Sequence, residues 1–185
     1  FYCFCGLYYL IFINTFNFSL GRLRVIQASD GSDVKLPAEV RARGKIEFHS
    51  DGRRLLGLFS VSGQPERLSW YDSNSGELKP VAIDPLDSVH RARMQWALSN
   101  DGQWIAFTTY QDRPGEQDGN NGPQCELWKV ATDGGQPQRL VVWPSRIYNV
   151  SADASGHGVF VATDRGSAFN DVWHIPFDQP LAAAR

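Results

Sequence analysis

The chain has 185 residues, of which 42% are hydrophobic, 12% aromatic and 21% charged. This balance is typical of one globular domain, or of part of a larger one, and excludes a disordered or collagen-like chain. The 18 basic and 20 acidic residues give a net charge of −2, so no basic field favours nucleic acid as a partner. Three cysteines are too few for a disulfide scaffold.

The first 18 residues carry no charge, and eight of them are aromatic. A membrane-spanning helix needs about 20 apolar residues, whereas aromatic and β-branched residues favour strands. Three interpretations of residues 1–21 therefore remain open: the remnant of a membrane anchor or export signal, strands of an incomplete repeat, or sequence foreign to the domain. Cys3 and Cys5 lack a nearby His or third Cys, so we interpret them as apolar filler rather than as a zinc site. Because the chain begins at Phe1 and its only Met is Met94, we expect a piece of a longer protein.

Three later segments repeat one pattern, in which an apolar residue and a polar turn precede an apolar run. They are residues 48–56, 98–107 and 150–161. The first two turns contain Asp51-Gly52 and Asp101-Gly102, and Asp-Gly is a strong hairpin signal because Gly adopts a positive φ easily. In the third copy we align Asp153 with the earlier Asp residues, which leaves two extra residues before Gly156.

Two further motifs recur with the turns. Asp112-Arg113 and Asp164-Arg165 each follow an apolar run, and their Asp residues are 52 positions apart. A strand that contains Trp follows in all three copies, at Trp70, Trp128 and Trp173, with the first Trp one residue later than the others. Because the copies reproduce these residues, we interpret them as structural: the Asp bonds the following turn or its Arg, and the Trp packs in the core or between blades.

Short strands at regular spacing, without an amphipathic helix longer than two turns, predict an all-β repeat protein. A four-stranded unit of about 40–50 residues is the blade of a β-propeller. We therefore predict a partial β-propeller of about three four-stranded blades plus a remnant of another. The expected divisions are an outer hairpin and connector at 22–45, blades at 46–96 and 97–148, and an incomplete blade at 149–185.

The repeat resembles that of TolB-type β-propellers, in which Ser-x-Asp-Gly, Asp-Arg-x-Gly, a Trp strand and Asp-Gly-Gly-x-x-x-x-Leu follow one another. Residues 97–140 carry the full order, residues 150–178 carry most of it, and residues 46–81 lack the Asp-Arg-x-Gly element. The resemblance implies part of a larger bacterial protein, because three blades fall short of the usual four to eight.

The resemblance leaves three functions open, because a fold does not choose among them. The leading expectation is a non-catalytic scaffold that binds a protein partner in the periplasm or cell envelope, with the cytoplasm as the alternative location. The second is the substrate-gating propeller of a prolyl-oligopeptidase-type serine peptidase, whose hydrolase domain would lie outside this chain. The third is the sensor domain of a membrane-anchored regulator, which an anchor at residues 1–18 would favour.

The chain has no Gly-x-Ser-x-Gly nucleophile elbow and no phosphate-binding loop, so we predict no catalytic residue and no cofactor. Its histidines are widely spaced and make no metal motif: His49, His90, His157 and His174. The polar insertion at 111–124 contains Asp118, Asn120 and Asn121, whose oxygens suit calcium. Their spacing does not follow the calcium-loop pattern, so we favour a flexible loop at a blade edge.

Trp143, Arg146 and Tyr148 lie close together between two predicted blades. If an aromatic patch binds a partner, we expect it here, because aromatic residues and Arg are enriched at protein interfaces. The expected partner is a protein and not a nucleic acid, and a membrane contact would come only through residues 1–18.

Overall fold

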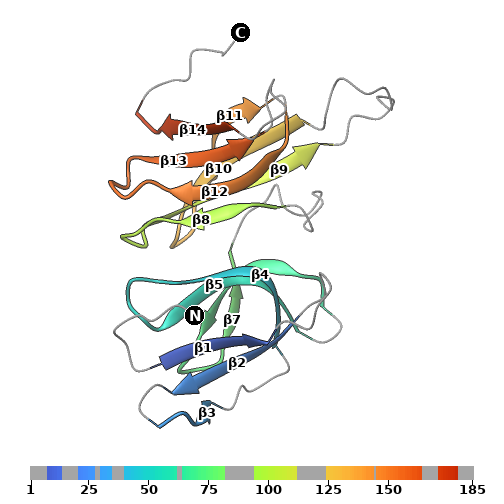
Figure 1. The fold of residues 1–185 in the computed structure, drawn as a ribbon, viewed down its shortest axis with the longest axis vertical. Helices are drawn as coiled ribbons and strands as arrows, with labels where there is room; N and C mark the ends of the chain where they lie inside the picture. The colour runs from blue at the N-terminus through green and yellow to red at the C-terminus, as the bar shows by residue number, and fades with distance from the viewer. Residues whose placement is uncertain are drawn as a thin grey trace. The chain divides into compact units, whose positions relative to one another are not determined.

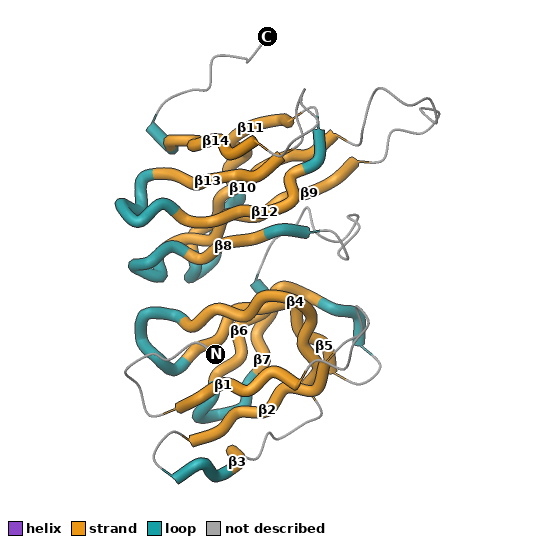
Figure 2. The backbone as a smooth tube through the Cα atoms, in the orientation of Figure 1, coloured by secondary structure: helices purple, strands orange, loops and turns teal. Residues whose placement is uncertain are grey.

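The structure is a computed structural model that describes residues 8–13, 21–27, 30–34, 40–61, 64–81, 94–111, 124–143, 145–163 and 171–178. Every regular element in these ranges is a β-strand, and every strand pairing is antiparallel (Figures 1 and 2). None of these ranges holds a helix with the length and apolar character needed to cross a membrane. The predicted all-β class is confirmed, and the strands fall into two compact units, Phe1–Val81 and Ala82–Arg185.

The first unit is one seven-stranded sheet. Its strands are β1 (Tyr8–Ile13), β2 (Gly21–Gln27), β3 (Asp33–Val34), β4 (Val40–Phe48), β5 (Arg54–Val61), β6 (Arg67–Asp72) and β7 (Leu78–Pro80). They pair in the order β1-β2-β4-β5-β6-β7, and β3 pairs with β2. Strands β4 to β7 form a meander of blade size. Part of the apolar N-terminal segment forms β1, which joins the same sheet through β2.

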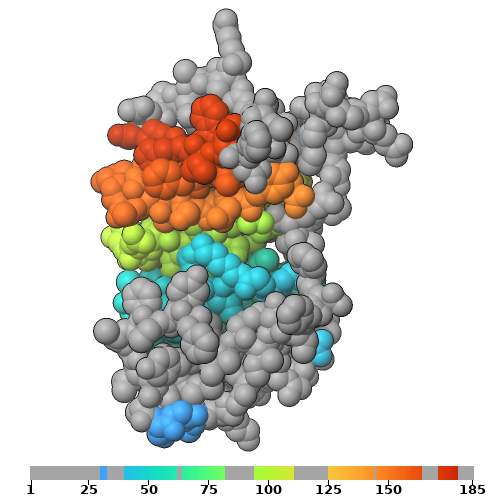
Figure 3. Space-filling view, viewed as in Figure 1, coloured from blue at the N-terminus to red at the C-terminus, as the bar shows by residue number. Residues whose placement is uncertain are grey.

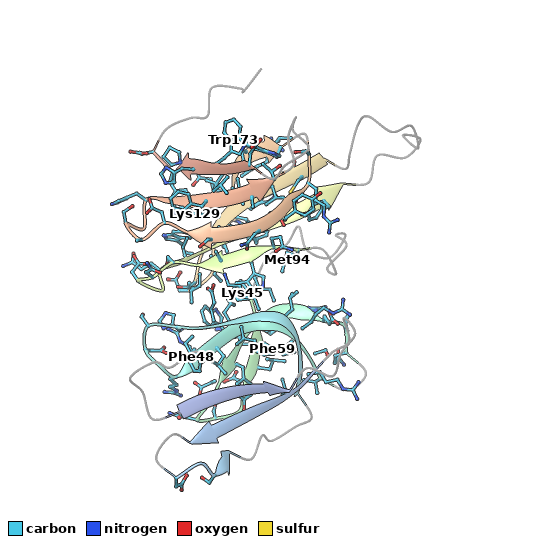
Figure 4. The ribbon with its side chains drawn as sticks, viewed as in Figure 1. Lys45, Phe48, Phe59, Met94, Lys129 and Trp173 are labelled. Atoms are coloured by element: carbon cyan, nitrogen blue, oxygen red, sulfur yellow. The ribbon has the colours of Figure 1, made fainter. Side chains whose placement is uncertain are left out.

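The apolar run of β5 is buried along six consecutive residues, as expected for a strand that is covered on both faces. The N-terminal half of β4 instead alternates, with Val40 and Ala42 buried and Arg41 exposed. On one face of the sheet a core cluster gathers five buried side chains, with Phe48 packed against it (Figure 4): Val40, Ala42, Leu55, Phe59 and Tyr71.

The second unit contains a four-stranded and a three-stranded sheet. The first sheet holds β8 (Trp96–Leu98), β9 (Trp104–Gln111), β10 (Gln124–Ala131) and β11 (Gln138–Trp143) in chain order. The second holds β12 (Ile147–Ala152), β13 (Gly158–Thr163) and β14 (Asp171–Pro176), also in chain order. The two sheets stack with β12 beside β8, and their residues form successive bands in Figure 3.

One hydrophobic core joins the two sheets of the second unit. All seven strands contribute buried side chains, among them Trp104, Leu127, Ile147, Val161 and Ile175. Each of these five is at most 5% exposed. Burial of apolar surface is the main stabilising term in folding, so the two sheets hold each other in place as neighbouring blades of a repeat protein do.

Trp104 lies at the edge of this core and connects the two sheets. Its indole N–H donates to the carbonyl of Gly156 at 3.2 Å, and Phe177 meets its ring edge-on at 4.7 Å between centroids. The ammonium of Lys129, labelled in Figure 4, lies 5.4 Å from the Trp104 ring and 4.0 Å from the Phe177 ring. Cation–π attraction of this kind adds to the packing.

The strand register explains why the Trp of the first copy falls one residue late. Arg54 and Trp104 begin β5 and β9, and Trp70 and Lys129 occupy matching positions on the next strands. In the first unit the Arg54 guanidinium lies 5.3 Å from the Trp70 ring. The same cation–aromatic contact is therefore built in both units with the two residue types exchanged.

Candidate interaction surface

The hairpin turns before β5, β9 and β13 share one set of backbone hydrogen bonds. They are His49–Arg54, Ser99–Trp104 and Asp153–Gly158, and in each the N–H of the first residue donates to the carbonyl of the sixth, at 2.8–3.0 Å. The fourth residues, Gly52, Gly102 and Gly156, have φ of 66°, 72° and 76°, a region that favours Gly. The third turn thus has no extra residues, which corrects the sequence alignment: Ser155, and not Asp153, matches Asp51 and Asp101.

The side chains of the first and third turn residues bond one another in every copy. His49 Nδ1 lies 2.9 Å from Asp51 Oδ2, and the Ser99 hydroxyl donates to Asp101 Oδ1 at 2.6 Å. In the third turn the two residue types exchange positions: the hydroxyl of Ser155, the third residue, donates to Oδ2 of Asp153, the first, at 2.8 Å. These bonds stay within each turn and stabilise it locally.

Asp51 has the densest set of partners among these residues. Its Oδ1 accepts the backbone N–H groups of Arg53 at 2.8 Å and Arg54 at 3.0 Å, and its Oδ2 accepts Arg54 Nε–H at 2.6 Å. Partial burial works to raise the pKa of Asp51, but the Arg54 and Arg53 donors and the charge of His49 outweigh it and lower the pKa to about 2. The carboxyl is therefore ionised near neutral pH and does not act as a general acid.

The third turn brings together the residue types of a hydrolase triad without its geometry. Ser155 Oγ and His174 Nε2 both bond the same oxygen, Oδ2 of Asp153, at 2.8 and 3.1 Å. A catalytic triad needs the imidazole between the hydroxyl and the carboxylate, so that it takes the hydroxyl proton. The backbone N–H and hydroxyl of Ser155, followed by His174, lower the pKa of Asp153. The arrangement stabilises a turn and does not activate Ser155.

The three residues predicted to bind a partner lie around the connection from β11 to β12: Trp143 ends β11, Arg146 lies in the connection, and Tyr148 belongs to β12. The structure places Trp143 in the core, where it is 3% exposed. Its indole N–H donates to Thr163 Oγ1 at 3.0 Å, and its ring meets that of Trp173 edge-on at 5.7 Å. Trp143 therefore belongs to the core, and Arg146 and Tyr148 are the members of the cluster that solvent reaches.

Hydroxyl groups that the sequence analysis did not single out hold this connection at both ends. Ser145 Oγ lies 2.9 Å from Thr163 Oγ1, and the buried Tyr110 hydroxyl donates to the Ile147 carbonyl at 2.5 Å. Burial raises the pKa of Tyr110, so this donor keeps its proton. The sequence carried only a weak signal of these hydrogen bonds. Tyr110 and Thr163 are polar residues at the ends of buried strands, and buried polar groups need a hydrogen-bond partner.

Arg146 and Tyr148 form the accessible part of the cluster. The register of β12 against β13 shifts between Ile147 and Asn149, so Tyr148 is the extra residue of a β-bulge. Its side chain is 39% exposed, and the Arg146 guanidinium lies 5.0 Å from its ring centroid. Bulges re-aim side chains and are common beside functional sites. Here the bulge presents a stacked cation–aromatic pair at the surface.

Several predicted residues lie outside the part of the chain that the structure describes. They are Asp112, Arg113, Asp164 and Arg165, the candidate calcium ligands Asp118, Asn120 and Asn121, and also Cys3, Cys5 and His90. Among the residues it does describe, no group of three His, Cys, Asp or Glu side chains is placed to hold a metal ion. Further large apolar side chains are exposed in the second unit: Val142, Phe160, Val172 and Trp173, the last of which is labelled on β14 in Figure 4.

Meanders of antiparallel strands that stack through a shared core define a β-propeller array. Among solved structures, the fold is similar to TolB from Acinetobacter baumannii, with a TM-score of 0.59 at 17% identity over 90% of this chain and 38% of that one. The protein assigned as TolB in Agrobacterium tumefaciens gives 0.60 at 17% identity, over 86% and 53%. A prolyl endopeptidase gives 0.62 at 14% identity, over 94% and 27%.

The chain therefore has a TolB-like propeller fold, as the repeat predicted. No protein-family model and no curated protein matches the sequence. The chain spans about a quarter to a half of the length of these structural neighbours. At identities of 14–17% the likeness establishes the fold alone.

Proposed function

We propose that the chain is a non-catalytic propeller scaffold that binds a protein partner through Arg146 and Tyr148. The observation that carries the proposal is the bulge at Tyr148, which presents a stacked cation–aromatic pair on a connection held from both ends. Tyr and Arg are among the residues that contribute most to protein–protein binding. A surface that is already ordered loses little entropy when a partner binds. By resemblance to TolB, the proposed location is the periplasm or cell envelope.

The prolyl endopeptidase match favours a second candidate, the substrate-gating propeller of a serine peptidase. In that case a hydrolase domain outside this chain would cleave the bond, and the propeller would control access to it. Sequencing the gene beyond both ends separates the candidates. A downstream Gly-x-Ser-x-Gly domain would support the gating propeller, whereas further repeats without such a domain would support the scaffold.

Site-specific photo-crosslinking tests the scaffold. A photoreactive benzoylphenylalanine replaces Tyr148 in one variant and Phe160, which is 41% exposed on β13, in a matched control. In cells of the source organism we expect a discrete protein adduct from position 148 that is absent from position 160. Equal labelling from both positions, or none from position 148, would contradict the proposal.

A further inference from the structure

We propose that Arg146 and Tyr148 form a carboxylate-binding site, so that the partner contacts the propeller with an acidic segment. This inference rests on the proposed scaffold function and names the chemistry of the partner. Three observations carry it: the ion pairing of the arginines, the contact of the guanidinium with Tyr148, and the place of Tyr148 in the repeat.

The first observation is that Arg146 and Arg139 differ in their ion pairing among the described residues. Two arginines are described in the second unit, and Arg139 bonds the Glu126 carboxylate at 3.0 Å. Arg146 has no carboxylate partner among the described residues, and its Nε is buried without a hydrogen bond. A guanidinium stays charged at all ordinary pH values. A partly buried charge that no described carboxylate balances favours an incoming carboxylate more than an exposed arginine does.

The second observation is the orientation of the guanidinium. Its carbon lies 5.0 Å from the Tyr148 ring centroid, which holds one face of the group. Since Nε is buried, the terminal nitrogens carry the donors that remain for a ligand. A planar carboxylate accepts two parallel N–H bonds from one guanidinium. Phosphate offers more oxygens and more charge, and suits clusters of several arginines, whereas a single guanidinium lies here among the described residues.

The third observation is that Tyr148 is not part of the repeated framework. Ile147 pairs with Thr163, and Ala42 pairs with Phe59 at the same distance from the shared hairpin turn. Arg146 therefore matches Arg41 of the first unit, so the arginine is repeated. The bulge that follows holds Tyr148 in β12 but Gly44 and Lys45 in β4. The tyrosine thus adds a property that the sheet of the first unit does not need.

Nuclear magnetic resonance of the arginine side chains tests the site in the full 185-residue chain. The probes are a blocked pentapeptide of Glu, its Gln counterpart, and a blocked phosphoserine peptide. We expect the Glu peptide to move the Arg146 Nε–H signal saturably, with a roughly millimolar Kd. The Gln peptide should bind about tenfold more weakly or not at all. The Arg139 signal serves as the internal control and should stay in place, because Glu126 already occupies that guanidinium.

Variants separate the planar group from its charge. In the variants, which lack the Arg146 Nε–H, peptide binding is read from the backbone amide signal of Tyr148. Arg146→Gln should abolish this response, and Arg146→Lys should weaken the binding about tenfold, because Lys keeps the charge and loses the bidentate plane. Equal shifts of both arginine signals, no saturable shift, or a stronger response to phosphoserine would overturn the carboxylate site. A partner that crosslinks at position 148 while the Glu peptide fails would reject this inference alone. Peptide binding without any crosslinked partner would reject the scaffold function and leave the site.

Discussion

Replacement of Asp51 by Asn separates the charge of this residue from its role as a hydrogen-bond acceptor. The Asn side chain keeps an oxygen for the backbone N–H groups of Arg53 and Arg54, but it loses the ion pair with Arg54 and the carboxylate contact with His49. Asp51→Ala loses both kinds of contact. The two variants together divide the stability of the first hairpin turn between charge and acceptor.

The pKa of Asp51 gives the size and the pH range of the charge contribution. A fall from 3.8 to about 2 corresponds to roughly 2.5 kcal/mol of preference for the ionised form in the folded state. The Asp51 and Arg54 side chains are 34% and 37% exposed, and solvent screening reduces the net contribution to about 1 kcal/mol. Because the folded-state pKa is depressed, this stability is complete above the unfolded pKa of 3.8 and is lost as the pH falls from 3.8 towards 2.

Urea unfolding followed by tryptophan fluorescence measures the effect, since Trp70 lies beside both His49 and Arg54. At pH 7 we expect Asp51→Asn to lower the free energy of unfolding by about 1 kcal/mol. Asp51→Ala should lower it by about 2 kcal/mol, because Ala also removes the acceptor of the turn. The gap between Asp51→Asn and the native chain should shrink below pH 4, and Asp133→Asn, at an exposed turn position, should change nothing. A gap that is absent at pH 7, or unchanged at pH 2, would refute this reasoning.

Three further variants or treatments follow from the second unit. Gly158→Ala should destabilise it by about 1–3 kcal/mol in thermal melts, because the new Cβ would lie 2.6 Å from His174 Nε2 and 2.8 Å from the Ile175 carbonyl. Adding His174→Ala should restore part of the lost stability. If it restores none, the clash lies at the Ile175 carbonyl instead. Trp104→Phe should cost about 1 kcal/mol, since it removes the N–H bond to the neighbouring turn. Cys125 is fully buried, which raises its pKa to about 11, so with the other cysteines replaced by Ser it should react with a thiol reagent only on unfolding.

The propeller class was readable from the sequence because its signals are local. A turn with positive φ selects Gly, as at Gly52 and Gly102, and an apolar run follows each turn as a buried strand. The third turn was misaligned because Asp and Ser serve equally well as the first or the third residue of the same hydrogen-bonded pair. The Ser hydroxyl donates in both turns, and the residue types alone do not reveal which of the two positions it takes.

The candidate surface was proposed from the sequence, but the sequence did not show which of its residues are buried and which are exposed. The burial of Trp143 depends on Thr163 and Trp173, which are 20 and 30 residues further along the chain. The exposure of Tyr148 depends on a one-residue bulge in the pairing of β12 with β13. Both properties are set by non-local strand register, and a single sequence carries no direct signal of register at a bulge.

The repeated contact between a cation and an aromatic ring shows what a residue-level motif leaves out. Arg54 lies over Trp70 in one unit and Lys129 lies over Trp104 in the other, so the contact repeats although the residues at the matched positions are exchanged. A search for identical residues registers only a displaced Trp. The contact at Arg146 and Tyr148 is of the same kind. By strand register Arg146 matches Arg41 of the first unit, whereas the bulge of β4 holds Gly44 and Lys45 where β12 holds Tyr148. The sheet of the first unit therefore forms without a tyrosine at this bulge, and this is the physical reason for proposing that Tyr148 serves binding rather than folding.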